Sequence, residues 1–118
     1  MKRVEIEVLG SEAALKAFAK VWRRARTGRA VTPRIAFGSL AELFSAITEK
    51  RLELIRHVTM HEGLNTRQAA LQLERDYKNV HTDVGALVGL GLLAKDNRGR
   101  LSAPYDEIVI RAELREAA

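Results

Sequence analysis

Three polar residues, Lys78, Asn79 and Thr82, are of types that recognise the edges of DNA bases. Lysine donates to guanine acceptors or binds a phosphate, asparagine pairs with adenine through two hydrogen bonds, and threonine offers a hydroxyl and a methyl group. All three lie in the polar first half of residues 74–93, whose second half is almost wholly apolar. Polar residues are common at the start of any surface helix, so ordinary solvent exposure is the competing interpretation.

One helix explains this change of character. If Asp76 is the N-cap of a helix of about four turns over residues 76–90, one face becomes apolar and must belong to the core. That face contains Val80, Val84, Leu87 and the region of Gly91, with Val88 at one margin and Tyr77, which is also a candidate DNA contact, at the other. Lys78, Asn79, Thr82 and Asp83 then project from the opposite side of the first two turns, where a recognition helix presents its side chains to the major groove.

The preceding helix adds Arg67 and Gln68 near its N-terminus, where free amides and an arginine could bind a DNA phosphate. Thr66 is the N-cap predicted for that helix. His81 lies beside the recognition face, which favours a phosphate contact or a partly packed ring over catalysis. For Arg67 and Gln68, solvent exposure is again the alternative.

A hairpin is predicted after Gly91, with two short extended runs around a polar Asp-Asn-Arg-Gly turn. Its loop places cations next to Gly99, where they could follow the DNA backbone or the minor groove. The residues concerned are Lys95, Asn97, Arg98 and Arg100. A charged turn with no ligand has the same composition, but its position directly after two closely spaced helices favours a DNA-binding wing.

The rest of the chain supplies elements that must position these residues. Alternation predicts strands at residues 4–9, 35–37 and 106–114, and pairing the first with the last would bring the two termini together. Helices are predicted from Ser11 to about Gly28 and from residue 48 to 61, the latter with Leu52, Ile55 and Val58 or Thr59 inward. Between them, Ser39 is expected to cap a short helix with four inward side chains. These four are Leu40, Leu43, Phe44 and Ile47.

The order helix, helix, helix, hairpin from residue 48 is that of a winged helix-turn-helix, so we predict an α+β fold of this kind with an N-terminal strand-helix-strand extension. The sequence shows no repeat and no linker. We therefore expect a single domain over residues 1–118. Within it, residues 1–38 form the extension, 39–104 the winged helix-turn-helix, and 105–118 a final strand and tail.

Composition limits the class of protein. The 118 residues are 47% hydrophobic, carry a formal charge of +5 and include no cysteine, which indicates a folded domain without disulfides and with a preference for an anionic partner. Two glutamates interrupt the region where a signal peptide would be apolar, and the longest apolar run is far shorter than about 20 residues, so a cytoplasmic location without a membrane is expected.

The N-terminal region is the most basic part of the chain. Residues 1–35 contain nine Lys and Arg against three Asp and Glu. Four arginines gather near the end of the first predicted helix, where they could contact flanking DNA, bind an acidic partner protein or stay solvated. They are Arg23, Arg24, Arg26 and Arg29. Trp22 is better interpreted as the core anchor of that helix.

No catalytic or cofactor motif is recognisable, so we predict a non-enzyme without cofactor. His57 and His61 lie four apart with Glu53 one turn earlier, a spacing that could bind zinc. The segment lacks the glutamate directly after the first histidine that a metalloprotease helix has, and no distant ligand is apparent. Two exposed histidines explain the pattern, and no metal site is expected. Gly85, Gly89 and Gly91 favour close packing and a helix C-cap rather than a phosphate loop.

Residues 34–114 resemble the small prokaryotic winged-helix transcriptional regulators with a MarR-like DNA-binding domain. The resemblance is carried by Asp76-Tyr77-Lys78-Asn79-Val80-His81 together with Pro104-Tyr105-Asp106-Glu107-Ile108. It implies a recognition helix over 76–90 and a wing over 92–104. Some members of that family are antitoxins encoded beside a small toxin. Gly85, Val88 and Gly89 depart from the family pattern, and the two glycines loosen the second half of the helix, since a helical glycine costs about 1 kcal/mol relative to alanine.

The expected function is sequence-specific binding of double-stranded DNA by a homodimeric repressor, with an antitoxin that binds a neighbouring toxin as the sharper version. Dimerisation is expected because one helix contacts few base pairs and a symmetric dimer doubles them. The terminal strands are the expected dimer element. Two alternatives remain open, which are a winged-helix protein-interaction module that reads no DNA and an RNA-binding protein.

Overall fold

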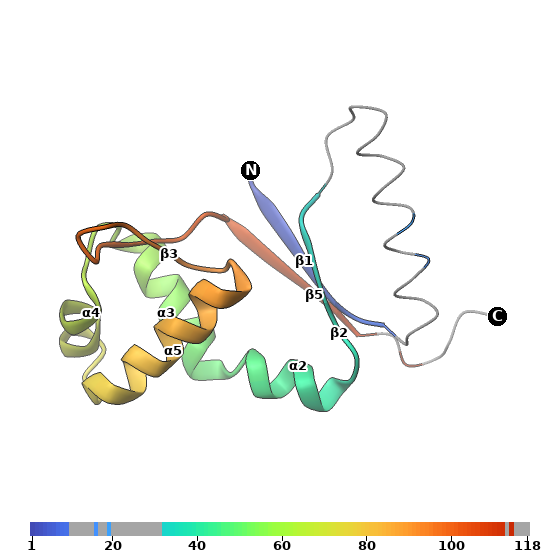
Figure 1. Cartoon of the computed structure of the whole chain (residues 1–118), viewed down its shortest axis with the longest axis horizontal. Coiled ribbons are helices and arrows are strands. Elements are labelled where there is room, and N and C mark those ends of the chain that lie inside the picture. The colour runs from blue at the N-terminus through green and yellow to red at the C-terminus, as the bar shows by residue number, and fades with distance from the viewer. Residues whose placement is uncertain (10–15, 17–18, 20–31, 113, 115–118) are drawn as a thin grey trace. The chain divides into compact units, whose positions relative to one another are not determined.

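The computed structural model describes residues 1–9, 16, 19, 32–112 and 114, and the account below concerns these residues alone. They form four helices and five strands (Figure 1). The fold class is therefore α+β, as the mixture of two-residue and helical periodicities predicted. Of the helix predicted between Ser11 and Gly28, only Lys16 and Ala19 are described, so Trp22 and the four arginines near its end lie outside the described residues. No helix of the described residues is both long and apolar enough to cross a membrane.

The chain separates into two compact units. The first comprises Met1–Ser45 and Glu107–Ala118, and the second comprises Ala46–Asp106. The helix α2 (Leu40–Ala46) belongs to the first unit as far as Ser45, and Ala46 is the first residue of the second unit.

The first unit contains a three-stranded parallel sheet in the order β2-β1-β5. These strands are β1 (Arg3–Val8), β2 (Arg34–Phe37) and β5 (Glu107–Ala112), close to the predicted ranges. In the register, Arg3 lies beside Glu107 and Val8 beside Ala112. The first and last strands thus pair as predicted, but because they run parallel, the N-terminal end of β1 meets the start of β5, and the expected meeting of the termini was wrong.

The two faces of this sheet differ in chemistry, because alternate side chains point to opposite faces. Val4 and Ile6 of the central strand are fully buried on one face. On the other face, Glu7 is buried and accepts hydrogen bonds from Arg34 of β2 and, at 3.3 Å, from Arg111 of β5. A charge on the central strand is thus neutralised by arginines from both neighbouring strands.

The short helix α2 begins as predicted, because the Ser39 hydroxyl accepts a hydrogen bond of 3.1 Å from the amide of Glu42. Its predicted inward face was half wrong. Leu43 is buried and Ile47, just after the helix, is also buried, but Leu40 and Phe44 are 40% and 65% exposed. This helix of seven residues makes only two turns, and of its apolar side chains only that of Leu43 is buried.

The second unit packs three helices and a hairpin around one apolar core. The helices are α3 (Glu49–Met60), α4 (Thr66–Gln72) and α5 (Tyr77–Leu90). From α3 the core takes Leu54, Ile55 and Val58, whereas Leu52, which we predicted to be inward, is only half-buried and Thr59 is exposed. The remaining core side chains are Ala69, Ala70, Val80, Val84, Leu87, Leu92, Leu93 and Leu101.

The predicted hairpin is present as β3 (Ala94–Lys95) and β4 (Leu101–Ser102), which pair antiparallel. A third segment joins it, since Leu101 donates to Leu64 at 2.7 Å and accepts from Gly63 at 3.0 Å. Asn65 and Arg100 form an isolated antiparallel bridge. The base of the hairpin is thereby fixed to the chain immediately before α4.

Candidate nucleic-acid interface

The N-terminal half of α5 is built as the sequence predicted. The Asp76 side chain caps it by accepting a 2.9 Å hydrogen bond from the amide of Lys78. Val80, Val84 and Leu87 are buried, and the margin residues Tyr77 and Val88 are each 38% exposed. On the opposite side, the side chains of the three predicted base-reading positions are exposed. These are Lys78, Asn79 and Thr82.

The three exposed residues differ in how many of their polar groups remain available to a ligand. The Thr82 hydroxyl donates to the carbonyl of Lys78 at 3.0 Å, so its methyl group and the lone pairs of its oxygen remain for an outside partner. Lys78 and Asn79 project from the first helical turn, next to backbone amides that favour anions. A lysine ammonium and an asparagine amide are therefore presented together at the positive end of a helix.

Asp83 does not belong to this exposed face, which corrects its predicted position. It accepts hydrogen bonds from Arg51 of α3 at 2.9 Å and from Arg75 of the α4–α5 turn at 2.7 Å, and its side chain is only 14% exposed. Burial raises the pKa of Asp83, but the hydrogen bonds and charges of Arg75 and Arg51 outweigh it and lower the pKa. Asp83 thus attaches α5 to the two preceding elements.

The turn between α4 and α5 is tight and contains a left-handed residue. Glu74 has φ 54, a conformation that glycine adopts more easily. The amide of Glu74 bonds to Leu71 and that of Arg75 to Ala70, so the turn closes on α4. The path from α4 to α5 is thereby fixed by backbone hydrogen bonds as well as by the arginine of the turn.

An aromatic cluster joins the starts of α4 and α5. The Arg67 guanidinium lies 4.5 Å from the ring centre of Tyr77, and that ring lies 5.7 Å from the ring of His81. Arg67 and His81 were predicted phosphate contacts, and the structure brings both to Tyr77. All three side chains are exposed, so stacking holds the arginine in place without neutralising it.

Gln68 has a structural partner instead of a free side chain. Its Oε1 accepts from the amide of Asn65 at 3.0 Å, and the Asn65 side chain accepts from the amide of Gln68 at 2.8 Å, which is a complete capping box. The predicted N-cap Thr66 is wrong by one residue, and Thr66 is buried in the first turn. The signal was present in the sequence as Asn-Thr-Arg-Gln.

Asp96, which sequence reasoning missed as an organising residue, shapes the hairpin loop. Its carboxylate accepts from the amides of Arg98 and Arg100 at 2.9 and 2.8 Å and from the Arg100 guanidinium at 2.8 Å. The backbone hydrogen bond from Arg100 is the main cause that lowers the pKa of Asp96. Gly99 adopts φ 79 and completes the turn. Arg100 is consequently paired, although its side chain remains 54% exposed.

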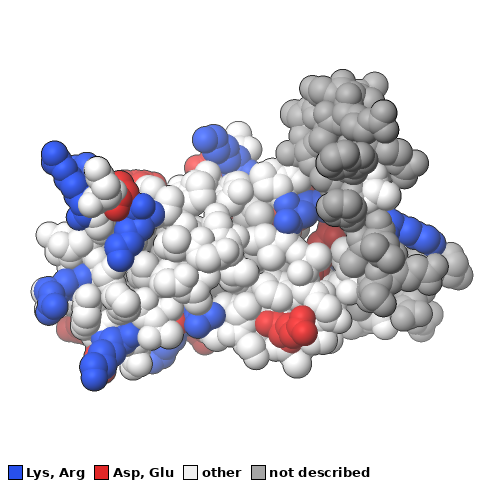
Figure 2. Space-filling model, viewed as in Figure 1, with Lys and Arg blue, Asp and Glu red and all other residues white. Residues whose placement is uncertain are grey.

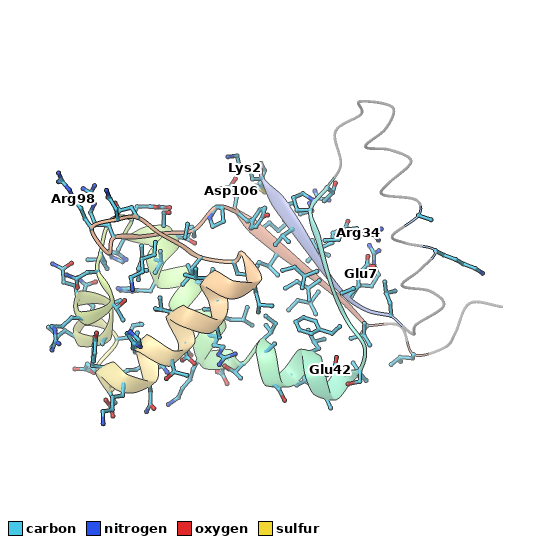
Figure 3. All side chains as sticks on the ribbon, viewed as in Figure 1. Lys2, Glu7, Arg34, Glu42, Arg98 and Asp106 are labelled. Atoms are coloured by element: carbon cyan, nitrogen blue, oxygen red, sulfur yellow. The ribbon has the colours of Figure 1, made fainter. Side chains whose placement is uncertain are left out.

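The hairpin loop still presents basic side chains to solvent. Lys95, Asn97 and Arg98 are exposed, and Arg98 lies at the hairpin tip (Figure 3). Figure 2 shows that Lys and Arg side chains gather over α4 and the hairpin on the face drawn. The second unit as a whole is nearly neutral, with nine Lys and Arg against eight Asp and Glu in residues 46–106. The positive character of this surface is therefore local.

The second half of α5 offers small residues. Apart from the neighbouring backbone of α5 itself, no atom lies within 4 Å of a Cβ placed at Gly85 or Gly89, so the close packing we predicted for these glycines was wrong. Gly91 confirms its predicted role, since it ends α5 with φ 79 as the C-cap.

The histidines of α3 are engaged with neighbours. His57 Nε2 lies 2.7 Å from the Gln72 side chain, and its ring stacks on His61 at 4.3 Å between ring centres. Among the described residues, no group of three or more His, Cys, Asp or Glu side chains is arranged to bind a metal ion.

A family model, HVO_A0114, matches residues 46–110, which is more than half of the chain. The chain belongs to the HVO_A0114 family. The match covers the whole second unit and the first residues of β5, so the residues of the candidate interface all lie within the HVO_A0114 region. The description of this family names no activity or partner. No curated protein and no solved structure was found to match the chain.

Proposed function

We propose that this protein is a sequence-specific DNA-binding transcriptional regulator of the winged helix-turn-helix class and acts as a dimeric repressor. One observation carries the proposal. Lys78, Asn79 and Thr82 are exposed together on the first two turns of α5, while the opposite face of the same helix is locked into the core. A helix held in this way presents donors and acceptors to base edges at a fixed angle.

The surrounding elements support the winged-helix interpretation. In chain order they are α3, α4, α5 and the hairpin β3–β4, with α4 and α5 joined by a short closed turn. The segment Gly63–Asn65 lies against β4, to which it is joined by backbone hydrogen bonds with Leu101 and by the isolated bridge between Asn65 and Arg100. This order and this pairing are typical of a wing that follows a helix-turn-helix.

The residue types suggest a division of labour. Asn79 and Lys78 read bases in the major groove, and Thr82 contacts a base edge through its methyl group. Arg67 and His81 contact the phosphate backbone beside the recognition helix, whereas Lys95, Asn97 and Arg98 reach the backbone or the minor groove from the wing. Arg100 and Gln68 mainly hold these elements in shape, because Asp96 and Asn65 already engage them.

The test is fluorescence anisotropy on the DNA upstream of the gene and on scrambled DNA across a salt series. Asn79→Ala should weaken binding to the specific site by about 1–3 kcal/mol and spare scrambled DNA, while Arg98→Ala should weaken both and reduce the salt slope by about one. Arg56→Ala, an exposed arginine of α3 outside the interface, is the matched control. Equal losses on both DNAs for Asn79→Ala would contradict the reading role.

The family resemblance of the sequence supports a sharper version, in which the chain is the antitoxin of a toxin-antitoxin operon and represses that operon. The partner would then be a toxin encoded by an adjacent gene. The arginines at 23, 24, 26 and 29 are candidates for that contact, although they lie outside the described residues. Co-expression with the adjacent reading frame followed by purification through a tag on this chain separates an antitoxin from a plain regulator.

One observation favours a second candidate, a winged-helix module that binds protein rather than DNA. Val88 is 38% exposed between Gly85 and Gly89, so the second half of α5 offers a flat apolar surface. This candidate predicts that removing the charges of Lys78, Arg98 and Arg100 leaves function unchanged. The anisotropy series with those variants decides between the two.

A further inference from the structure

The strand β5 forms one edge of the parallel sheet, in the order β2-β1-β5 of the described strands. An edge strand presents a row of backbone donors and acceptors that can pair with another chain. Ile110 in this strand is 46% exposed, which is a large apolar surface for a residue in a sheet. Among the described residues, this edge thus combines backbone groups that have no strand partner with exposed hydrophobic area.

The backbone groups that face outward can be assigned. The amide of Glu107 donates to the carbonyl of Lys2, so the backbone of residue 107 faces β1. Because backbone groups alternate in direction along a strand, those of 109 and 111 also face β1. The amides and carbonyls of Ile108 and Ile110 therefore face the open edge.

The sequence of β5 is complementary to itself when reversed. In an antiparallel pair of two copies centred on Val109, Glu107 lies opposite Arg111 of the second copy and Ile108 lies opposite Ile110. This register makes the outward-facing residues Ile108 and Ile110 the hydrogen-bonded pairs and leaves Val109 opposite Val109 as a non-hydrogen-bonded pair, as an antiparallel ladder requires. Charge, hydrophobicity and backbone direction agree on one register.

We propose that β5 pairs antiparallel with β5 of a second copy of this chain in this register, which joins two three-stranded sheets into one six-stranded sheet. The inference rests on the proposed function only for the biological role of the dimer, since its structural argument comes from the sheet alone. A two-fold axis perpendicular to the sheet passes between the two Val109 residues. The contact is isologous and closes after two copies.

Each sheet face gains matching contacts in this dimer. On the face of Val4 and Ile6, two isoleucines from each copy form one cluster that extends the buried surface. On the charged face, two Glu107–Arg111 pairs flank the central valines. Both charged side chains remain about half exposed despite their internal partners Arg3 and Glu7, so each can take a second partner. Cross-strand pairs of opposite charge and of β-branched residues both stabilise antiparallel sheets.

The other edge of the sheet does not offer this match. Self-pairing of β2 with its sequence Arg-Ile-Ala-Phe centred on Ile35 sets Arg34 opposite Ala36, which provides no opposite charge. The strand has four residues against six in β5. The edge of β5 is therefore the better surface for a second copy.

The test uses the full chain in sedimentation velocity and equilibrium without DNA. The wild-type chain should have twice the 13.2 kDa mass of one copy. Glu107→Arg sets arginine opposite Arg111 twice, and Arg111→Glu sets glutamate opposite Glu107 twice. Each single variant should weaken the dimer by about tenfold or more, because two attractive pairs become two repulsive pairs.

Mixing the two single variants separates repulsion from a folding defect. One copy then carries arginine at both positions and the other carries glutamate at both, so both cross-strand pairs become attractive and the mixture should regain the dimer mass. A matched control is Glu53→Arg on α3, which makes the same charge reversal as Glu107→Arg at an exposed position outside the sheet and should leave the dimer mass unchanged.

Three results would overturn the proposal. They are a wild-type monomer, a dimer that both single variants preserve, and single-variant monomers that fail to associate when mixed. Since the masses are measured without DNA, none of these results bears on whether α5 reads DNA. Conversely, a chain that dimerises as described and binds no DNA in the anisotropy series would overturn the proposed function and leave this interface in place.

Discussion

At the scale of single residues, Asp83 shows how a charged group on a recognition-type helix can serve architecture. Its two carboxylate oxygens are divided between Arg51 and Arg75, and all three side chains are between 13% and 17% exposed. Arg75 Nη1 is buried and has no hydrogen-bond partner within the part of the chain described. The carboxylate is therefore the main compensation for a buried guanidinium.

Replacement of Asp83 by asparagine should destabilise the fold by about 2–3 kcal/mol, because it leaves two arginines near the interior without their counter-charge. Urea unfolding followed by circular dichroism measures this loss. Glu53→Gln, which removes an exposed carboxylate from α3, is the control and should change stability by less than about 0.5 kcal/mol. A comparable loss in both variants would show that the ion pairs contribute nothing specific.

The same carboxylate predicts a pH dependence. The pKa of Asp83 is lowered from the ordinary value of 3.8, so the folded state binds its proton less readily than the unfolded state. Its contribution is complete above that value and is lost as the pH falls through the lower pKa of the folded state. Wild-type stability should thus fall more steeply than that of Asp83→Asn below about pH 4, and parallel curves would contradict this assignment.

At the scale of elements, α5 combines a rigid start with a weak end. Gly85 and Gly89 have open space at their Cβ positions, and neither requires a left-handed conformation. Alanine at either position should stabilise the protein by about 1 kcal/mol, because it removes backbone entropy from the unfolded chain. Thermal unfolding measures the gain. Gly91→Ala is the matched contrast and should destabilise, since Gly91 adopts φ 79.

Local patterns predicted most elements because their signals are local. Asp76 and Ser39 were identified as caps from residue type and from the hydrophobic run that follows, and both caps are present. The stripe of Val80, Val84 and Leu87 needs only the helical period. Errors arose where the outcome depends on distant chain. The spacing of Phe44 places it on the apolar side of α2, but this spacing does not tell which side chains of a two-turn helix other elements will bury.

The residue types of the candidate interface could be predicted from the sequence, but not which of their side chains are already engaged by other residues of the chain. Lys78 and Asn79 are exposed as expected, whereas Asp83 is held by Arg51, a residue 32 positions earlier that no local pattern connects to it. Asp96 was visible only as part of a polar turn. The parallel direction of β1 and β5 was likewise a tertiary outcome, since alternation specifies a strand and not its partner or direction.

At the scale of the whole molecule, charge is divided unevenly along the chain. The second unit, which carries the candidate interface, has a net charge of +1, and the remaining residues supply the other +4 of the total. If the second unit binds DNA as we propose, its low net charge allows few phosphate contacts, so a single copy should bind DNA weakly and with a shallow salt slope. Dimerisation would raise both the affinity for DNA and the salt slope, because two copies contact the same duplex.

On a palindrome with half-sites about 10 base pairs apart, the wild-type chain should bind with about twice the salt slope that it shows on an isolated half-site. Glu107→Arg should keep the half-site affinity, because residue 107 is not part of the candidate interface, but it should lose most of the additional affinity for the palindrome. The mixture of Glu107→Arg with Arg111→Glu should restore that affinity. Anisotropy titrations of the two duplexes at three salt concentrations measure these affinities and salt slopes. If Glu107→Arg lost as much affinity for the half-site as for the palindrome, β5 would contribute to the folding of the second unit rather than to the pairing of two copies.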